Sequence, residues 1–205
     1  MVMKYHIILA SNSPRRRELL GGLGIPFEVR VLPDISESYP DTLPAADIAE
    51  YISREKGIAY KEIIDDNALV ITADTVVICG DEVLGKPTDS ADACRMLRML
   101  SGRTHQVITG VCLTTMNGQH SFSVKTDVTF KTLSDEEINY YVETYNPMDK
   151  AGAYGIQEWI GYIGVTGLNG SYFNVMGLPV QRIYEELRRL KVIIPPIPFC
   201  GTRSM

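Results

Sequence analysis

Residues 5–20, YHIILASNSPRRRELL, contain the change of pattern that decides the fold class. The apolar run at residues 5–10 is typical of a short β-strand. Ser13 and Pro14 have the residue types of a helix N-cap and a first helical position, and leucines at positions 19, 20 and 23 follow at helical spacing before Gly24. The stretch therefore predicts a strand, a tight turn and a helix in direct succession, as in α/β proteins.

The alternation of strand and helix patterns continues along the chain. The predicted elements are strands at residues 27–32, 68–84 and 159–166, and helices at residues 45–64, 90–100, 134–145 and 179–191. Residues 101–133 predict two long strands joined at Asn117-Gly118, a strong hairpin signal. We therefore predict a mixed α/β sheet flanked by helices, partly antiparallel, in two lobes with a central cleft that holds the functional site.

Composition limits the class of protein and its partners. The chain has 205 residues, 45% of them hydrophobic and 22% charged, so it can bury a sizeable core. We expect a single domain of two lobes over residues 1–191, followed by a C-terminal tail at residues 192–205 that contains three prolines. The net charge of -5 argues against a nucleic-acid partner, because such binding needs an excess of Lys and Arg over one face.

The cysteines and the apolar runs indicate a cytoplasmic protein. Cysteines at positions 79, 94, 112 and 200 form no CxxC pair, which argues against a zinc site and against a disulfide framework. The apolar run near the N-terminus is too short for a signal sequence, and no stretch of about 20 apolar residues is present. We expect reduced thiols, a cytoplasmic location and no membrane partner.

Three consecutive arginines at positions 15–17 lie where the first turn of a helix is predicted. The helix macrodipole makes cations unfavourable there, whereas an anion at the same end is stabilised by free N–H groups. Arg15 and Arg16 would add bidentate donors that suit phosphate oxygens. The alternative is that the three side chains only reach solvent. The motif makes a local phosphate site a reasonable hypothesis for this acidic protein.

Asp74 lies inside the apolar run VITADTVVI, where an unpaired carboxylate is costly to bury. It could cap a neighbouring turn, or it could hold a divalent cation, since Mg²⁺ uses one or two carboxylates together with substrate phosphates. Glu37 in the polar loop DISESY is a second candidate carboxylate. Lys86 lies between a glycine and a proline that fix its backbone, and it can act as a point charge on phosphate. Lys56, on a predicted helix, would otherwise be an ordinary surface lysine.

Other kinds of site find no support in the sequence. Histidines at positions 6, 105 and 120 form no recognisable triad with a serine or cysteine, so nucleophilic catalysis is not indicated. The glycines between residues 161 and 177 form no GxGxxG between a strand and a helix, so a dinucleotide loop is not indicated either.

Six segments, in this order and at these separations, resemble the Maf family of nucleoside triphosphate pyrophosphatases: SNSPRRRELL, TADTVV, LGKP, SGRTHQVITG, DKAGAYGIQ and NVMGLP. The resemblance covers about residues 5–190 and makes residues 1–191 the catalytic domain. It implies hydrolysis of a nucleoside triphosphate between the α and β phosphates, with a divalent cation, Mg²⁺ or Mn²⁺, as cofactor. It also suggests a homodimer.

The resemblance assigns roles to the charged residues. Asp74 matches the family's proton acceptor, placed to activate water or to hold the metal. Lys56 and Lys86 match its phosphate-binding lysines. The turn from Ser11 to Arg16 looks like a triphosphate cradle, with Ser13 and the helix N-terminus as donors and Arg16 as a charge clamp.

The positions that sort the family by base match Arg15, Thr75 and Gln157, and these residue types resemble the branch that acts on dTTP and UTP. The resemblance extends the expected substrates to modified pyrimidine nucleotides. The match departs from the family in the acidic loop. Relatives often carry two adjacent acidic residues there, whereas this chain has Ser36 followed by Glu37. Glu37 is therefore expected to serve with Asp74 as a metal ligand, with Asp34 as the alternative loop carboxylate.

A different class of function is a regulatory protein that binds nucleotide as a signal, because the family is also described as inhibiting septum formation. Such a protein would bind dTTP without releasing pyrophosphate. A carboxylate placed to activate water favours the enzyme, because a binding protein has no need of that group.

Overall fold

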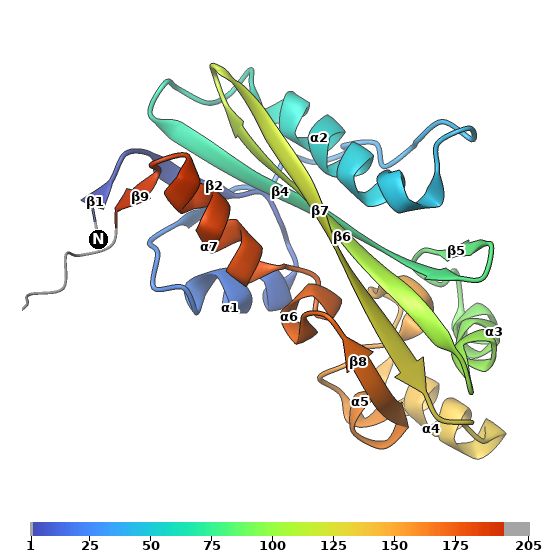
Figure 1. Ribbon diagram of the computed structural model, residues 1–205. Helices are drawn as coiled ribbons and strands as arrows, with labels where there is room; N and C mark the ends of the chain where they lie inside the picture. Colours follow the sequence, from blue (N-terminus) through green and yellow to red (C-terminus); the bar gives the residue numbers. More distant parts are fainter. Residues whose placement is uncertain (1, 195–205) are drawn as a thin grey trace, which may run out of the picture.

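The computed structural model describes residues 2–194, which form a seven-stranded mixed sheet with helices on both faces (Figure 1). The strand order is β3-β2-β4-β6-β7-β8, and β5 pairs with β4. The strands are β2 (His6–Leu9), β3 (Glu28–Val29), β4 (Ala68–Cys79), β5 (Glu82–Leu84), β6 (Thr104–Thr115), β7 (Gly118–Phe130) and β8 (Val165–Asn169). Strand β2 is parallel to β3 and β4, and the other pairings are antiparallel. The predicted mixed α/β class is confirmed.

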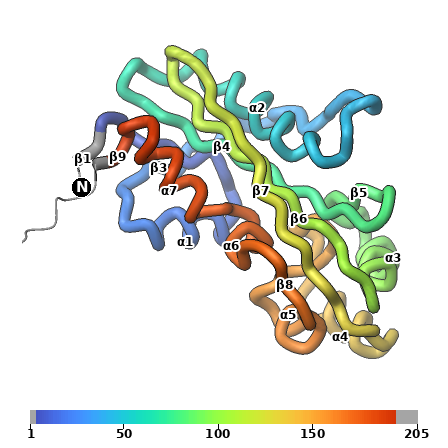
Figure 2. Tube along the Cα trace, in the orientation of Figure 1, coloured from blue at the N-terminus to red at the C-terminus, as the bar shows by residue number. Residues whose placement is uncertain are grey.

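Helices cover the two faces unequally. Helix α2 (Ile48–Tyr60) crosses β4 and β6 on one face, and α1 (Pro14–Gly21) and α7 (Val180–Arg189) lie on the other (Figures 1 and 2). The remaining helical elements are η1 (Ala45–Asp47), α3 (Ser90–Leu100), α4 (Asp135–Tyr145), η2 (Ala151–Ala153), α5 (Trp159–Gly164) and α6 (Tyr172–Val175). Two short strands, β1 (Val2–Met3) and β9 (Ile193–Ile194), bring the two ends of the described chain together.

Strand β4 distributes its side chains with the period of two that a strand imposes. Leu69, Ile71 and Ala73 enter the hydrophobic cluster with α1 and α7, whereas Val76 and Ile78 enter the cluster with α2. Neighbouring residues of β4 therefore point to opposite faces of the sheet. This alternation separates Asp74, on the α2 side, from Thr75.

One edge of β4 is unpaired at its centre. Strand β6 pairs with residues 70–78 along one edge of β4, while β2 pairs with residues 68–71 and β5 with residues 77–79 along the other. Residues 72–76 therefore lack a strand neighbour on that second edge. This gap in the sheet is where the cleft described below opens.

Local capping predictions agree with the structure. Ser13 caps α1 with Pro14 at its first position, and Ser134 forms a complete capping box with Glu137. The hairpin joins β6 to β7 through the pair Thr115 and Gly118. These features depend on residues close in sequence, and the sequence therefore contained the information needed to predict them.

The strand predicted at residues 159–166 is wrong. Residues 159–164 form α5, and the strand β8 begins only at Val165. A side chain at Gly161 would overlap the carbonyl group of Ile156, so this glycine lets the helix turn back closely on the preceding segment. Ile160 is fully buried in the cluster with α3 and α4, and that burial fixes the helical turn.

The C-terminal boundary stays a prediction. Val192 and Ile193 are buried in the cluster formed with α1 and α7. Residues 195–205 of the predicted tail, and Cys200 with them, lie outside the described residues. Within the described chain, Cys79, Cys94 and Cys112 are free thiols, and none of its helices is long and apolar enough to cross a membrane.

His105 makes the stability of the fold dependent on pH. Its ring is 1% exposed, lies edge-on to Phe130 and contacts Tyr154, whose hydroxyl is 2.7 Å from Nε2. Burial lowers the pKa of His105 to about 4. The unfolded chain, with a pKa near 6.5, therefore takes up a proton first as the pH falls, and the folded state loses stability between these two values.

We expect the free energy of unfolding to fall by roughly 2–3 kcal/mol between pH 6.5 and pH 4. Urea denaturation across this range measures the fall. His105→Gln should flatten the dependence, because the buried imidazole is then absent. An unchanged slope in His105→Gln would assign the pH dependence to other groups.

Candidate active site

A cleft of about 770 Å³ lies at the gap in the edge of β4. Its walls come from the turn before α1, the loop between β3 and η1, α2, the centre of β4, and residues 149–157 and 175–177. Every residue that the sequence predicted for the site lines this cleft, namely Ser11, Ser13, Arg15, Arg16, Glu37, Lys56, Asp74, Thr75, Lys86 and Gln157. The alternative carboxylate, Asp34, lines it too.

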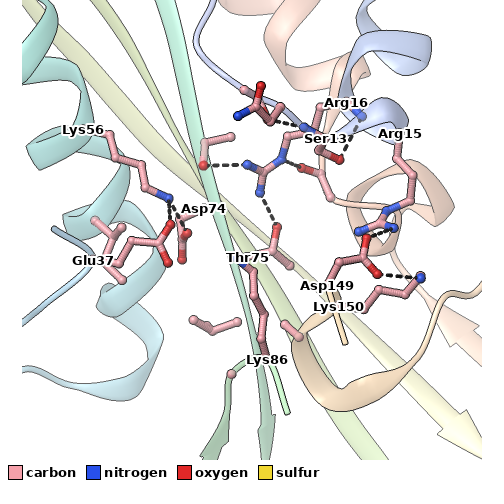
Figure 3. A pocket seen from close by; sticks show the side chains of 18 of the residues that line it. Ser13, Arg15, Arg16, Glu37, Lys56, Asp74, Thr75, Lys86, Asp149 and Lys150 are labelled. Carbon is pink, nitrogen blue, oxygen red and sulfur yellow. Dashed lines mark hydrogen bonds and ion pairs between the residues drawn. The ribbon is translucent and has the colours of Figure 1, made fainter. Parts of the chain in front are cut away.

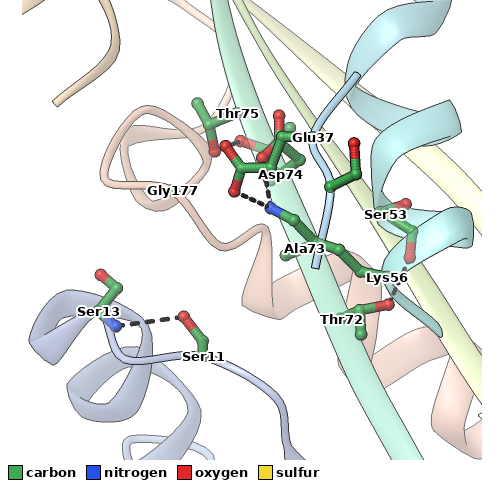
Figure 4. Close-up of polar contacts among 12 residues, drawn as sticks. Ser11, Ser13, Glu37, Ser53, Lys56, Thr72, Ala73, Asp74, Thr75 and Gly177 are labelled. Carbon is green, nitrogen blue, oxygen red and sulfur yellow. Dashed lines mark hydrogen bonds and ion pairs between the residues drawn. The ribbon is translucent and has the colours of Figure 1, made fainter. Parts of the chain in front are cut away.

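The carboxylates of Asp74 and Glu37 share one ammonium group. Lys56 Nζ donates to Asp74 Oδ1 at 2.8 Å and lies 2.7 Å from Glu37 Oε1 (Figure 4). Lys56 and Asp74 are each 14% exposed, whereas Glu37 is 50% exposed. Thr72 fixes α2 against β4 by donating to the Ser53 carbonyl at 2.6 Å, one helical turn before Lys56. The costly carboxylate inside the apolar strand is therefore compensated by a buried cation.

Electrostatics keep Glu37 ionised. Burial alone would raise its pKa, but the hydrogen bond and charge of Lys56, with smaller contributions from Lys86 and Arg16, outweigh burial and lower it. This ion pair joins the loop that carries Glu37 to α2, as Figure 3 shows. Glu37 therefore presents negative charge to the cleft at neutral pH.

Arg16 closes the unpaired edge of β4. Its guanidinium donates to the Ala73 carbonyl at 2.7 Å, to Thr75 Oγ1 at 3.1 Å and to the Gly177 carbonyl at 2.8 Å. Thr75 Oγ1 also lies 3.0 Å from Thr109 Oγ1. Sequence reasoning treated Arg16 as a phosphate clamp and did not predict these bonds, which join α1 to residues distant in sequence.

The basic turn before α1 uses several of its own donors. Ser13 Oγ accepts from the Arg16 N–H at 3.4 Å, Ser11 Oγ accepts from the Ser13 N–H at 3.2 Å, and Pro14 has no N–H. The Arg17 N–H donates to the Ser13 carbonyl. The helix start therefore offers an anion fewer backbone donors than the sequence suggested, and the Arg15 N–H is the first-turn donor left without a partner among the described residues.

A charged segment that the sequence analysis did not assign to the site forms the opposite wall (Figure 3). Arg15 Nη1 donates to Asp149 Oδ2 at 3.0 Å, and Lys150 Nζ donates to Asp149 Oδ1 at 2.8 Å. Lys150 is only 8% exposed, and it also lies 3.1 Å from Glu158 Oε1. The signal was the charged start of DKAGAYGIQ, but neither its pairing with Arg15 nor its burial can be read from the sequence.

Lys86 and Gln157 each have a polar group without a partner among the described residues. Lys86 is exposed and forms no ion pair with the described residues. Gln157 Oε1 is buried and has no hydrogen-bond partner in the described part of the chain. A buried amide oxygen without a donor is costly, and a ligand N–H would satisfy it.

The charge of the cleft suits a substrate with several negative charges. Five cations line it, Arg15, Arg16, Lys56, Lys86 and Lys150, against four carboxylates, Asp34, Glu37, Asp74 and Asp149. The small positive surplus does not neutralise a triphosphate. A cation bound together with the substrate would supply the positive charge that the side chains lack.

The donor set also suits a hard divalent cation. The described residues contain no group of three or more His, Cys, Asp or Glu side chains able to hold a metal. Asp74 and Glu37 nevertheless converge on one positive charge, and two carboxylates completed by substrate phosphates are a common arrangement for Mg²⁺.

Comparisons with known proteins agree with the geometry. A dTTP/UTP pyrophosphatase of Phocaeicola vulgatus is 64% identical over 187 residues, covering 91% of this chain and 97% of the relative. A dTTP/UTP pyrophosphatase of Bacteroides thetaiotaomicron is 60% identical over the same length and coverage. The structure of the Staphylococcus aureus Ham1 protein has the same fold, with a TM-score of 0.51 and 14% identity over 90% of this chain and 99% of that one.

The family model described as Maf-like protein matches residues 6–190. The matched range includes all the residues of the cleft. This chain therefore belongs to the Maf family.

Proposed function

We propose that this protein hydrolyses dTTP and UTP between the α and β phosphates, releasing the nucleoside monophosphate and pyrophosphate. The observation that carries the proposal is the Asp74–Lys56–Glu37 group, with contacts of 2.8 and 2.7 Å, in a basic cleft at the unpaired edge of the sheet. The names of the relatives at 64% and 60% identity support the same reaction.

The triphosphate would lie between the two charged walls. Lys86, which has no partner among the described residues, would bind a phosphate oxygen directly, and the Arg15 side chain and N–H would bind another from the start of α1. Arg16 supports this binding chiefly by holding α1 against β4, because three of its five donors are already engaged.

Asp74 would act as the proton acceptor. The oxygen of a water molecule bonds to the α phosphorus, a proton passes to Asp74, and the bond to the bridging oxygen breaks so that pyrophosphate leaves with the electron pair. Lys56 holds the Asp74 carboxylate in place through its hydrogen bond, and Lys86 and Arg15 offset the charge that collects on the leaving group.

Asp74 and Glu37 would hold the divalent cation, Mg²⁺ or Mn²⁺. When bound, the cation neutralises phosphate charge and polarises the phosphoryl group as a Lewis acid. Both carboxylates would then contact Lys56 as well as the metal. Two protein carboxylates would leave the other ligand positions of the metal to substrate phosphates.

We expect Glu37→Gln to raise the Mg²⁺ concentration for half-maximal activity by about tenfold or more, because a ligand charge is lost while the shape of the side chain is kept. Asp34→Asn removes one charge from the same cleft and should leave the Mg²⁺ dependence near that of the wild type. Pyrophosphate release titrated with Mg²⁺ measures both. The reverse result would make Asp34 the loop carboxylate.

Gln157 would select the base. Its buried Oε1 is an acceptor without a donor, and thymine and uracil both present an imide N–H, whereas the equivalent ring nitrogen of cytosine is an acceptor. Thr75 and Arg15 contribute less directly, because Thr75 binds Arg16 and Arg15 binds Asp149. Two acceptors facing each other would disfavour CTP as long as the amide keeps this orientation.

A regulatory nucleotide-binding protein is the less favoured alternative, because the relatives are named as pyrophosphatases. We further propose a homodimer, which the family resemblance suggests and which light scattering on the purified protein tests. We also propose a cytoplasmic location, from the cysteines and apolar runs of the sequence.

The direct test of the function is pyrophosphate release from dTTP, UTP, CTP, GTP and 7-methyl-GTP with Mg²⁺ or Mn²⁺. We expect dTTP and UTP to be hydrolysed fastest. Saturable binding of dTTP without pyrophosphate release would instead support the regulatory protein.

A further inference from the structure

A single hydroxyl group holds both ends of the turn that carries Gln157. Tyr141 lies on α4, and its side chain is fully buried. Its hydroxyl accepts a hydrogen bond from the Gly155 N–H at 3.0 Å and donates one to a carboxylate oxygen of Glu158. The Glu158 N–H donates to the Gly155 carbonyl at 3.0 Å, which closes the turn.

The other oxygen of Glu158 reaches the wall of the cleft. Glu158 Oε1 lies 3.1 Å from Lys150 Nζ, and Lys150 bridges to Asp149, the partner of Arg15. Lys150 is 8% exposed, so it needs counter-charges close by. The chain of contacts from Tyr141 therefore ends at two residues of the cleft wall, Lys150 and Gln157.

The backbone of Gly155 packs closely against the side chains of Gln157 and Glu158. A Cβ atom at Gly155 would lie 2.9 Å from Gln157 Nε2 and 3.0 Å from Glu158 Oε2. The amide of Gln157 therefore lies directly over the backbone of Gly155, whose N–H is held by Tyr141. A shift of that backbone would move the amide.

We propose that Tyr141 and Glu158 are positioning residues for pyrimidine selection, which they exert by fixing the Gln157 amide and the Lys150 ammonium in the cleft. The inference rests on the proposed function. Neither residue lines the cleft, so both act through their neighbours. Tyr141 and Glu158 hold Gln157 Oε1, an acceptor without a donor, at a fixed place for the imide N–H of a bound thymine or uracil.

The protonation of Tyr141 is consistent with this role. Burial, followed by the hydrogen bond and the charge of Glu158, raises the pKa of Tyr141 well above its ordinary value. The hydroxyl therefore keeps its proton and remains a donor to Glu158 throughout the neutral range. The Gly155 N–H, which is buried, would lose its partner if the hydroxyl were removed.

The test is Tyr141→Phe, with selectivity as the readout. We expect kcat/KM for dTTP to fall by about tenfold or more, and the ratio of kcat/KM for dTTP to that for CTP to narrow by a similar factor. A ratio of two substrates measured on one preparation is independent of the fraction of folded enzyme. A role confined to core packing would lower the Tm and leave this ratio unchanged.

Tyr140→Phe is the matched control. Tyr140 precedes Tyr141 on α4, is 49% exposed, and contacts Trp159 through its ring, which phenylalanine retains. Its hydroxyl has no hydrogen bond to the described residues. We expect the dTTP to CTP ratio of this variant to equal that of the wild type.

Glu158→Gln gives a second test should Tyr141→Phe fail to fold. It keeps an acceptor for Tyr141 but leaves Lys150 with Asp149 as its one carboxylate partner among its present contacts. We expect a severalfold loss in the dTTP to CTP ratio. An unchanged ratio in either folded variant, with wild-type protein that hydrolyses dTTP, overturns the inference alone. Wild-type protein that releases no pyrophosphate from dTTP overturns the proposed function and the inference with it.

Discussion

Asp74→Asn is expected to lower kcat for dTTP by a factor of about 10²–10⁴, the usual contribution of a positioned proton acceptor. Asparagine has the same shape as aspartate, and its amide oxygen can still accept from Lys56, so the side chain should stay in place. The variant loses the group that takes the proton from water and one of the two carboxylates that face the cation. Pyrophosphate release at saturating dTTP and Mg²⁺ measures the loss.

The control for Asp74→Asn is Asp81→Asn. Asp81 is exposed, in the turn between β4 and β5, and does not line the cleft. We expect wild-type kcat and an unchanged Tm for this control variant. Turnover of Asp74→Asn within a few-fold of the wild type would show that another group accepts the proton.

Gly110→Ala is expected to have the largest effect on stability. Gly110 lies on β6 opposite Asp74, and a Cβ atom there would overlap the backbone of Ala49 and Glu50 in the first turn of α2. Backbone atoms cannot move aside as a side chain can, so α2 must shift away from the sheet. We expect the free energy of unfolding to fall by about 3 kcal/mol or more, at the upper end for overpacking.

Because α2 carries Lys56, the same shift should also weaken the Lys56–Asp74 contact and lower the activity of the folded fraction. Gly21→Ala is the matched control, and we expect it to raise the free energy of unfolding slightly instead of lowering it. Gly21 is an exposed residue of α1 whose added Cβ would meet no atom closer than 4.0 Å, and alanine is the better helix former. Equal stability of Gly110→Ala and wild type in urea denaturation would show that α2 does not pack on β6 this closely.

The parts of the fold that depend on neighbouring residues were predictable. The Ser13 cap, the Asn117-Gly118 hairpin and the capping box at Ser134 each follow from residue types a few positions apart. The residues predicted for the site also line one cleft. They could be selected because they lie in or near the short segments that resemble the family. Their chemical roles remain proposals.

The features that the sequence could not supply depend on distant contacts. Arg16 has the residue type of a phosphate ligand, yet its three bonds go to Ala73, Thr75 and Gly177, and this requires knowing that β4 lacks a neighbour there. The pattern of residues 159–164 resembles a strand, and the helix arises from burial of Ile160 and the close approach at Gly161. Contacts between distant residues therefore decide the partners of Arg16. At residues 159–164 they override the local preference for a strand.

The central claim is that water, directed by Asp74, attacks the α phosphorus of dTTP. Hydrolysis in water enriched in ¹⁸O, with the products analysed by mass spectrometry, tests it most directly. The account predicts dTMP carrying one ¹⁸O atom and pyrophosphate carrying none. Label in pyrophosphate, or in inorganic phosphate released alongside dTDP, would contradict it.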